Sequence, residues 1–185
     1  LLNMITKAAQ DGTALLENLL DWARLQTGHI VYQPEEFKVN DLIEEARVFA
    51  QSSASRKNIK LVYTKTEELV TCSGDVNMLQ TVLRNFLTNS IKFTPREGQV
   101  EIGARAADKK VEIFVKDSGI GMTPEQIGSL FDISHKNKTA GTMGEKGTGL
   151  GLHLCREFVE LHNSKINISS EPYKGSRFTF VLPRV

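Results

Sequence analysis

Residues 85–94 read Asn85-Phe86-Leu87-Thr88-Asn89-Ser90-Ile91-Lys92-Phe93-Thr94. At about 100° per residue, Asn85, Asn89 and Lys92 fall on one narrow stripe of a helix. The broad face beside this stripe is apolar and would pack on a core; it carries Leu79, Val82, Leu83, Phe86 and Leu87. Two amides and an ammonium next to an apolar edge suit a metal-bound phosphate beside a stacked base. Taken alone, however, such a stripe is more often a solvated helix face.

The composition is that of a globular protein. The chain has 185 residues, of which 40% are hydrophobic and 24% are charged, enough for one domain and an appendage. Lys and Arg number 23 against 22 Asp and Glu, so no net charge favours nucleic acid or an anionic membrane. No apolar run approaches the roughly 20 residues that span a bilayer, and no signal peptide is visible.

Cysteine and histidine spacing gives no sign of a metal site. Cys72 and Cys155 belong to no CxxC pair and are expected to be buried free thiols in a reducing compartment. The four histidines form neither an HExxH nor a zinc pattern, and His153 and His162 are expected to have structural roles.

The first residues carry a long amphipathic pattern. Apolar or small residues recur three and four apart between Leu2 and Thr27, which predicts a helix roughly 40 Å long that stops at Gly28. One small domain could cover only part of such a helix. We therefore expect it to pack against partner helices; packing on its own domain is the alternative.

The remaining chain alternates between helical and extended patterns. Helices are expected from an Asn40 or Asp41 cap to Lys57, from Asp75 to Pro95, from a Thr123 cap with Pro124 in the first turn, and over 150–161. A short extended stretch is expected at 29–32, and strands are expected at 59–64, 69–72, 100–106, 111–116, 166–170 and 178–182. This order predicts an α+β fold: a two-layer α/β sandwich whose mixed, mostly antiparallel sheet has helices on one face, preceded by the long helix.

Two glycine motifs lie on either side of a stretch without periodicity. Asp117-Ser118-Gly119-Ile120-Gly121 follows a predicted strand, where a carboxylate could accept from an exocyclic amine, although DxGxG taken alone is more often a plain turn. Residues 133–146 read as a mobile loop that closes over a ligand. Gly147-Thr148-Gly149-Leu150-Gly151 then opens a helix, and exposed amides there attract anions. It is neither a Walker A loop nor a Rossmann fingerprint, and a flexible hinge is the alternative.

The combination is more specific than its parts. An Asn-x3-Asn-x2-Lys helix, DxGxG, a long loop, GxGxG opening a helix and Gly175-Ser176-Arg177-Phe178 entering a last strand resemble the catalytic domain of sensor histidine kinases. That domain belongs to the GHKL superfamily and has the Bergerat ATP-binding fold. The stretch 19–28 (LLDWARLQTG) resembles the end of the second helix of that family's dimerisation and phosphoacceptor domain. The resemblance thus implies a partial helical hairpin at 1–29 and a catalytic domain at 30–185, with an ATP lid at about 132–147.

The resemblance also implies roles for individual residues. Asn89 would ligate Mg2+ with Asn85 beside it, Lys92 would reach phosphate oxygens, and Asn89 and Lys92 would be the catalytic pair. Phe93 would line the adenine slot, Asp117 would accept from the adenine amino group, and Thr179 would assist through water. The backbone around the base and the phosphates would come from Gly119, Gly121, Lys146, Gly147, Thr148, Gly149, Leu150 and Gly151.

The chain departs from the family pattern at three points. No histidine has the setting of the phosphoacceptor, which in this family precedes an acidic residue on the first bundle helix. We therefore expect the acceptor helix to lie outside this chain. The lid entry reads Phe131-Asp132-Ile133-Ser134 in place of Phe-x-Pro-Phe, and Lys146 replaces a common glycine.

What the resemblance implies is a cytoplasmic histidine kinase fragment that uses ATP and Mg2+. It would act as a homodimer through its bundle helices, pass phosphate to a response regulator receiver domain, and come from a parent anchored in the bacterial inner membrane. Neither nucleic acid nor membrane contact is expected. One alternative is another GHKL ATPase, such as a chaperone or topoisomerase, but these carry a catalytic Glu where this chain has Asn85. The other is a non-catalytic nucleotide-binding or dimerisation module.

Overall fold

The structure is a computed structural model that describes residues 12, 31–66, 69–132, 141–145 and 149–185. The predicted long helix, apart from Gly12, and most of the predicted lid therefore lie outside the described residues. The elements in chain order are β1 (Glu35–Lys38), α2 (Val39–Arg56), β2 (Lys60–Thr64), β3 (Thr71–Gly74), α3 (Val76–Phe93), β4 (Gln99–Ala107), β5 (Lys110–Asp117), α4 (Pro124–Gly128), α5 (Gly151–Leu161), β6 (Asn167–Glu171) and β7 (Gly175–Pro183).

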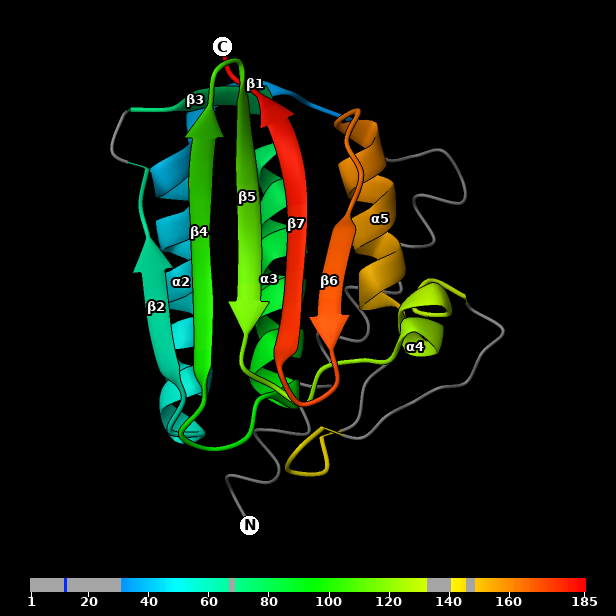
Figure 1. Ribbon diagram of the computed structural model, residues 1–185. Helices are drawn as coiled ribbons and strands as arrows, with labels where there is room; N and C mark the ends of the chain where they lie inside the picture. Colours follow the sequence, from blue (N-terminus) through cyan, green and yellow to red (C-terminus); the bar gives the residue numbers. More distant parts are fainter. Residues whose placement is uncertain (1–11, 13–30, 67–68, 133–140, 146–148) are drawn as a thin grey trace.

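Two layers make up the fold. The main sheet has five strands in the order β2-β4-β5-β7-β6; β2 and β4 are parallel and the other neighbours are antiparallel. Helices α2, α3 and α5 lie together on one face of this sheet, and α4 lies near the end of β6 (Figure 1). A two-stranded sheet of β1 and β3 closes one end. This arrangement confirms the predicted α+β sandwich with helices on one face.

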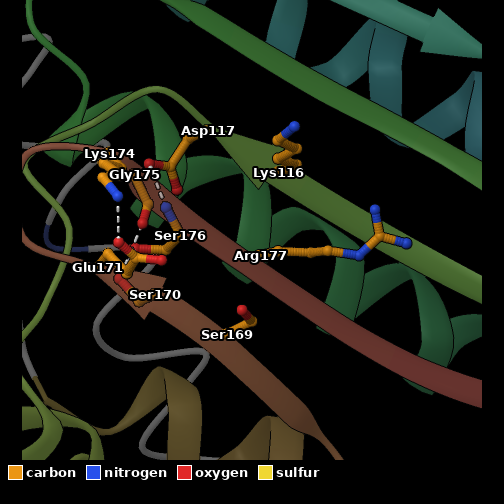
Figure 2. Close-up of a pocket in the computed structure, with 9 residues that line it drawn as sticks. All are labelled: Lys116, Asp117, Ser169, Ser170, Glu171, Lys174, Gly175, Ser176 and Arg177. Carbon is orange, nitrogen blue, oxygen red and sulfur yellow. Dashed lines mark hydrogen bonds and ion pairs between the residues drawn. The ribbon is translucent and has the colours of Figure 1, made fainter.

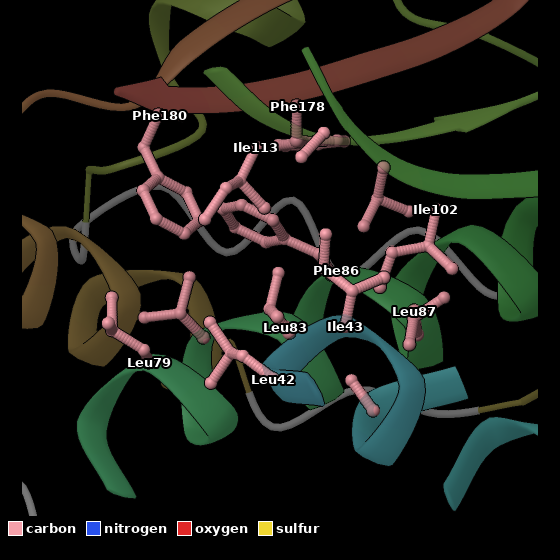
Figure 3. Close-up of a cluster of buried hydrophobic side chains, with 14 of the residues drawn as sticks. Leu42, Ile43, Leu79, Leu83, Phe86, Leu87, Ile102, Ile113, Phe178 and Phe180 are labelled. Atoms are coloured by element: carbon pink, nitrogen blue, oxygen red, sulfur yellow. The ribbon is translucent and has the colours of Figure 1, made fainter. Parts of the chain in front are cut away.

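The core fills the space between the helices and the sheet. Phe86 of α3 is fully buried and packs against Phe178 and Phe180 of β7, with ring centroids 5.2 and 6.5 Å apart. Figure 3 shows this aromatic contact among Leu and Ile side chains from α2, α3, β4 and β5. The apolar face of α3 that the sequence predicts is the face that packs here. The stripe of Asn85, Asn89 and Lys92 therefore lies outside the core.

Helix caps follow the prediction in two of three cases. Asp75 caps α3 by accepting from the Met78 amide, and Thr123 forms a capping box with Gln126 at the start of α4. The expected cap of α2 is wrong: α2 begins at Val39, and neither Asn40 nor Asp41 caps it. Asn40 is turned instead toward Thr66, whose amide donates to its side-chain oxygen.

Both cysteines are buried free thiols, as expected. None of the helices in the described part of the chain has the length and hydropathy needed to cross a membrane.

Candidate functional site

The C-terminal half of α3 is where the predicted motifs meet. Asn85, Asn89 and Lys92 lie along it, and the Asp117 loop, the start of α5 and the segment 141–145 all contact this half of the helix. Figure 1 shows the end of α3, the end of β5 and the segment 141–145 at the same end of the molecule. Motifs that are far apart in the sequence thus form one site.

Asp117 is the buried carboxylate of this site. It ends β5 and is 5% exposed. One oxygen accepts from the Gly119 amide (2.8 Å) and the Ser176 amide (3.2 Å), and the other accepts from the Ser90 hydroxyl (3.1 Å). Burial nevertheless raises the pKa of Asp117, because the three hydrogen bonds only partly offset the lost hydration.

The glycines of the DxGxG motif are required by close backbone contacts. A Cβ on Gly119 would lie 2.6 Å from the Phe93 carbonyl oxygen. Gly121 has φ +64°, and a Cβ there would lie 1.8 Å from the Glu171 carbonyl oxygen. The Ile120 amide donates to the Phe93 oxygen at 3.1 Å. The loop after Asp117 is thereby fixed to the end of α3, which holds Phe93 beside the carboxylate.

Asn85 and Asn89 have different surroundings. The Asn85 amide group donates to the Thr81 carbonyl at 2.9 Å, and its oxygen lies against Gly151, where a Cβ would come within 2.2 Å. Gly151 is therefore the close approach that brings the start of α5 onto α3. Asn89 is half-buried and makes no side-chain hydrogen bond to another described residue. It is thus the amide with its donor and acceptor available for a ligand.

Lys92 lies at the other end of the stripe. Its Nζ is 4.5 Å from the centroid of the Phe93 ring. Burial lowers the pKa of Lys92, and the nearby Glu145 carboxylate opposes that shift. The Lys92 carbonyl accepts from the Thr142 amide at 3.1 Å, so the segment 141–145 lies directly on this turn. A partly desolvated ammonium next to a ring suits a phosphate adjoining a flat base.

Thr179 is the predicted site residue that the structure does not bring to this site. Phe178 and Phe180 point into the core, so the residue between them points to the helix-free face, where its register partner is Phe114. Ser176 has the parity of the two phenylalanines, and its amide contacts Asp117 directly. Strand alternation, which the sequence displays, excludes Thr179 from the Asp117 side.

A hollow on the helix-free face adjoins the same loop. Figure 2 shows it where the ends of β5, β6 and β7 meet, with Lys116 and Arg177 pointing away from the Asp117 carboxylate and Lys174 paired with Glu171. Its volume is about 180 Å3. That is below the roughly 300 Å3 of small ligand sites. Because Lys116 and Arg177 alternate with Asp117 and Ser176 along their strands, this hollow lies across the sheet from α3.

The second glycine motif is described only in part. Lys146, Gly147 and Thr148 lie outside the described residues. Gly149 has φ +78°, and Leu150 precedes the first residue of α5, Gly151. The amides of the first helical turn have no partner within the helix, so a helix start here is suited to an anion.

Comparison with known proteins assigns the chain to a family. The sequence profile described as "Histidine kinase-, DNA gyrase B-, and HSP90-like ATPase" matches residues 74–185, which is more than half of the chain. The chain belongs to this family. The match covers the Asn/Lys helix, the DxGxG loop and the second glycine motif, so the family resemblance drawn from these motifs is confirmed.

Similar curated members of the family are sensor kinases. The chain is 29% identical over 170 residues to the sensor histidine kinase RcsC of Escherichia coli, covering 91% of this chain and 18% of RcsC. It is also 29% identical to the adaptive-response sensory kinase SasA of Synechocystis, covering 91% of this chain and 44% of SasA. The chain thus spans less than half the length of either relative.

Solved structures of this family share the fold. The catalytic domain of the histidine kinase ThkA aligns with a TM-score of 0.72 and 27% identity, over 82% of this chain and 98% of that domain. Full-length ShkA, solved in complex with AMPPNP, aligns with a TM-score of 0.82 and 24% identity, over 99% of this chain and 38% of ShkA. The described domain therefore has the fold of a histidine kinase catalytic domain.

Two contributors to the family site were missed from the sequence. Ser90 and Ser176 both hydrogen-bond Asp117, one by its hydroxyl and one by its amide. Ser90 follows Phe86 by one helical turn on the buried face, and a hydroxyl in an apolar row needs a buried partner. That signal was available. The contact of Ser176 with Asp117 depends on the pairing of β5 with β7, which the sequence does not reveal.

Proposed function

We propose that this chain is the catalytic part of a sensor histidine kinase, which binds ATP with Mg2+ and transfers the γ-phosphate to a histidine on a helix outside the chain. The observation that carries the proposal is the convergence on α3: a buried carboxylate at Ser90, a free amide at Asn89 and a half-buried ammonium at Lys92. These groups lie within about one turn of α3 and together suit a base, a metal ion and a phosphate chain.

The residues fit both parts of the nucleotide. The free Asn89 oxygen is a hard ligand of the kind that Mg2+ binds. Asn85 lies one turn earlier on α3, where it contacts the start of α5. Asp117 accepts from three donors, yet its pKa is still raised. A fourth donor, such as an adenine amino group, would stabilise the ionised carboxylate further. Gly119 and Gly121 let the backbone approach the base.

The proposed mechanism is positioning and charge compensation. A bound magnesium ion would neutralise charge on the phosphate oxygens. Lys92 adds a positive charge for the phosphates, and the start of α5, which contacts Asn85, offers amides to them. Phe93 shields the ammonium from water on one side, which strengthens its interaction with phosphate. An incoming neutral imidazole supplies the nucleophile, so the chain itself needs no general base.

The surroundings of Asn85 favour a kinase over an ATPase that activates water. Members that hydrolyse ATP for conformational work carry a carboxylate where this chain has Asn85, and an amide cannot act as a general base. Glu145 is the acid of segment 141–145, but both its oxygens are engaged, one by Lys57 and one by the Met143 amide.

The larger organisation is part of the same proposal. Residues 1–29 would complete a dimerisation and phosphoacceptor hairpin with a helix outside the chain, and residues 132–147 would form the lid over ATP. The partners would be a second copy and a response regulator receiver domain. We place the domain in the cytoplasm, attached to a membrane-anchored parent.

The proposed function is tested by two experiments, one on nucleotide binding and one on phosphotransfer. We expect calorimetry to detect ATP binding that strengthens with Mg2+, and Asn89→Ala to remove most of that magnesium dependence. Asn77→Ala is the matched control, because Asn77 is an exposed asparagine in the first turn of the same helix. Asn77→Ala should leave ATP affinity unchanged with and without Mg2+.

Phosphotransfer is measured on a longer polypeptide that includes the upstream reading frame. With labelled ATP we expect an acid-labile, base-stable phosphoryl group, as phosphohistidine is, and little free phosphate. Rapid release of free phosphate without protein labelling would refute the kinase proposal in favour of an ATPase. Binding without either reaction would favour a non-catalytic module.

A further inference from the structure

Lys57 is a buried lysine that the proposed chemistry does not use. It follows α2 as its C-cap residue and is 4% exposed. Its ammonium donates to the carbonyl oxygens of Ile91 and Lys92 and to Glu145 Oε1, each at 2.8 Å. The two carbonyls belong to the last turn of α3, which carries the negative end of the helix dipole. All three donors of the ammonium are therefore used.

Glu145 turns this contact into a link between α2 and the segment 141–145. Its second carboxylate oxygen accepts from the Met143 amide at 2.7 Å, and its carbonyl accepts from the Gly141 amide at 2.9 Å. The segment is thus folded around the carboxylate that Lys57 holds. Gly141 leaves room for this carboxylate, because a Cβ would lie 2.3 Å from Glu145 Oε2.

The folded segment lies against Lys92. The same Cβ on Gly141 would come within 2.6 Å of Lys92 Cγ, so the stem of the Lys92 side chain passes directly over this glycine. The Lys92 carbonyl accepts from Lys57 on one side and from the Thr142 amide on the other. Both the backbone and the side-chain stem of Lys92 are therefore held by groups that depend on Lys57 or on the segment it retains.

A second consequence concerns the glycine-rich motif that follows. Glu145 precedes this motif in the chain, and Gly151 ends it against Asn85. The described residues Glu145 and Gly151 are thus both attached to α3, the first through Lys57 and the second through Asn85.

We propose that Lys57 is a positioning residue for the phosphates: through Glu145 it docks segment 141–145 on the last turn of α3, and so fixes Lys92. The inference rests on the proposed nucleotide function and deepens it. A buried ion pair is weak evidence for stability as such, since desolvation offsets much of its attraction. Its use here is geometric, because it joins three segments at the phosphate end of the site.

The experiment compares two ligands that share a base and differ in phosphates. ATP and adenosine are titrated by calorimetry into the 185-residue chain with Mg2+, and into the variants Lys57→Met and Lys57→Arg. We expect Lys57→Met to weaken ATP binding by about tenfold, as the loss of one charge-assisted contact would do, and to leave adenosine binding within about twofold. Lys57→Arg keeps the charge and the donors and should restore part of the ATP affinity.

Two further variants guard against trivial outcomes. Lys60→Met removes an exposed lysine of β2 three residues away and should change neither affinity. If Lys57→Met does not fold, Glu145→Gln removes the same ion pair from the partly exposed partner, and the same loss for ATP alone is expected. Equal losses for ATP and adenosine, or ATP affinity within about twofold of the parent in a folded variant, would overturn the inference.

Hydrogen exchange separates this inference from the proposed function. The amides of Gly141, Thr142 and Met143 are hydrogen-bonded in the docked segment, and Lys57→Met should make them exchange faster without nucleotide. If the parent chain binds no ATP, the proposed function fails and the phosphate role of Lys57 fails with it. Unchanged exchange at these amides in Lys57→Met would refute the docking itself, whatever the nucleotide result.

Discussion

At the scale of single residues, Asp117 is the side chain whose environment most needs an explanation. A carboxylate that is 5% exposed is costly to bury, and three donors still leave its pKa raised. The ionised form is therefore less stable here than in water. A ligand that adds a donor would remove part of that cost, and a charge-assisted hydrogen bond contributes about 1.5–3 kcal/mol. The residue is thus better suited to a complex than to the free domain.

Asp117→Asn should lose selectivity between adenine and guanine nucleotides. Adenine has an amino donor where guanine has a carbonyl acceptor, and an amide can serve either while a carboxylate serves only the first. We expect ATP affinity to fall about tenfold or more and GTP affinity to be unchanged or to rise. Calorimetry with both nucleotides checks this, and equal binding of ATP and GTP by the parent chain would contradict the role of Asp117.

Among the described glycines of the two motifs, Gly121 and Gly149 are the pair with positive φ. Gly121 and Gly149 have φ of +64° and +78°, but only at Gly121 would a Cβ meet backbone, 1.8 Å from the Glu171 oxygen. Gly121→Ala should lower the free energy of unfolding by about 2–4 kcal/mol, from strain plus a clash, and Gly149→Ala by about 1 kcal/mol from strain alone. Urea denaturation measures both. Similar losses of unfolding free energy in the two variants would contradict the prediction, because the backbone at Glu171 would then have moved to accommodate the Cβ at position 121.

The sequence misled the prediction at Thr179, where strand alternation was overlooked, and it could not reveal contacts between residues far apart in the chain. The alternation Phe178, Thr179, Phe180 was visible, and it places Thr179 across the sheet from Asp117. The close contact of Gly151 with Asn85 was not visible, because it depends on how α5 packs on α3. Motif spacing was sufficient to predict that Asn89, Lys92 and Asp117 belong to one candidate site; it could not identify which backbone contacts hold them there.

At the scale of elements, His162 joins α5 to the start of α3. Its Nε2 accepts from the Asp75 amide at 2.9 Å, and its Nδ1 lies 2.7 Å from the Phe158 carbonyl, so Nδ1 carries the proton of a neutral ring. Tyr32 meets the ring edge-on. Burial lowers the pKa of His162 below its ordinary value. The imidazole thus links two helices and the segment before β1 only while it is neutral.

His162→Gln should reduce stability in a pH-dependent way. Because the folded state disfavours the charged ring, the unfolded chain binds more protons, and the contribution of His162 is present above pH 6.5 and lost as pH falls through its lower folded pKa. At pH 8 we expect a loss of about 1–3 kcal/mol from the two hydrogen bonds. Urea denaturation from pH 8 to pH 5 should show the difference from the parent narrowing; a constant difference would contradict the neutral-ring account.

Element prediction succeeded where the pattern was periodic and failed where tertiary pairing decides. The apolar faces of α3 and α5 and the alternation of β7 were sufficient to locate them. β1 was missed because Glu35-Glu36-Phe37-Lys38 has few strand-forming residues and is held extended by pairing with β3. The cap of α2 was misassigned because Asn40 has a competing partner in Thr66, 26 residues away.

At the scale of the whole molecule, the sheet separates two different surfaces. The helix-bearing face holds the core and, at one end of α3, the candidate site (Figures 1 and 3). On the opposite face, Phe114 is covered by Arg105 and Arg177, whose guanidinium groups lie 5.5 and 4.1 Å from its ring centroid. Long side chains can thus cover an apolar residue while keeping their charges in water. The architecture followed from composition and pattern because a two-layer sandwich needs only one apolar face per element.

The proposed dimer is a property of the whole chain, and residues 1–29 should determine it. An apolar stripe about 40 Å long exceeds what one small domain can cover, so the chain should bury it against a second copy. We expect the mass of the 185-residue chain in sedimentation to rise with concentration, and that of a chain starting at residue 31 to stay monomeric. Trp22, the single tryptophan, should change its fluorescence over the same dilution series. A monomeric mass and constant fluorescence throughout would contradict the partner-helix role. It would leave the proposed nucleotide site unaffected, because the contacts of that site in the described part of the chain all come from residue 57 onward.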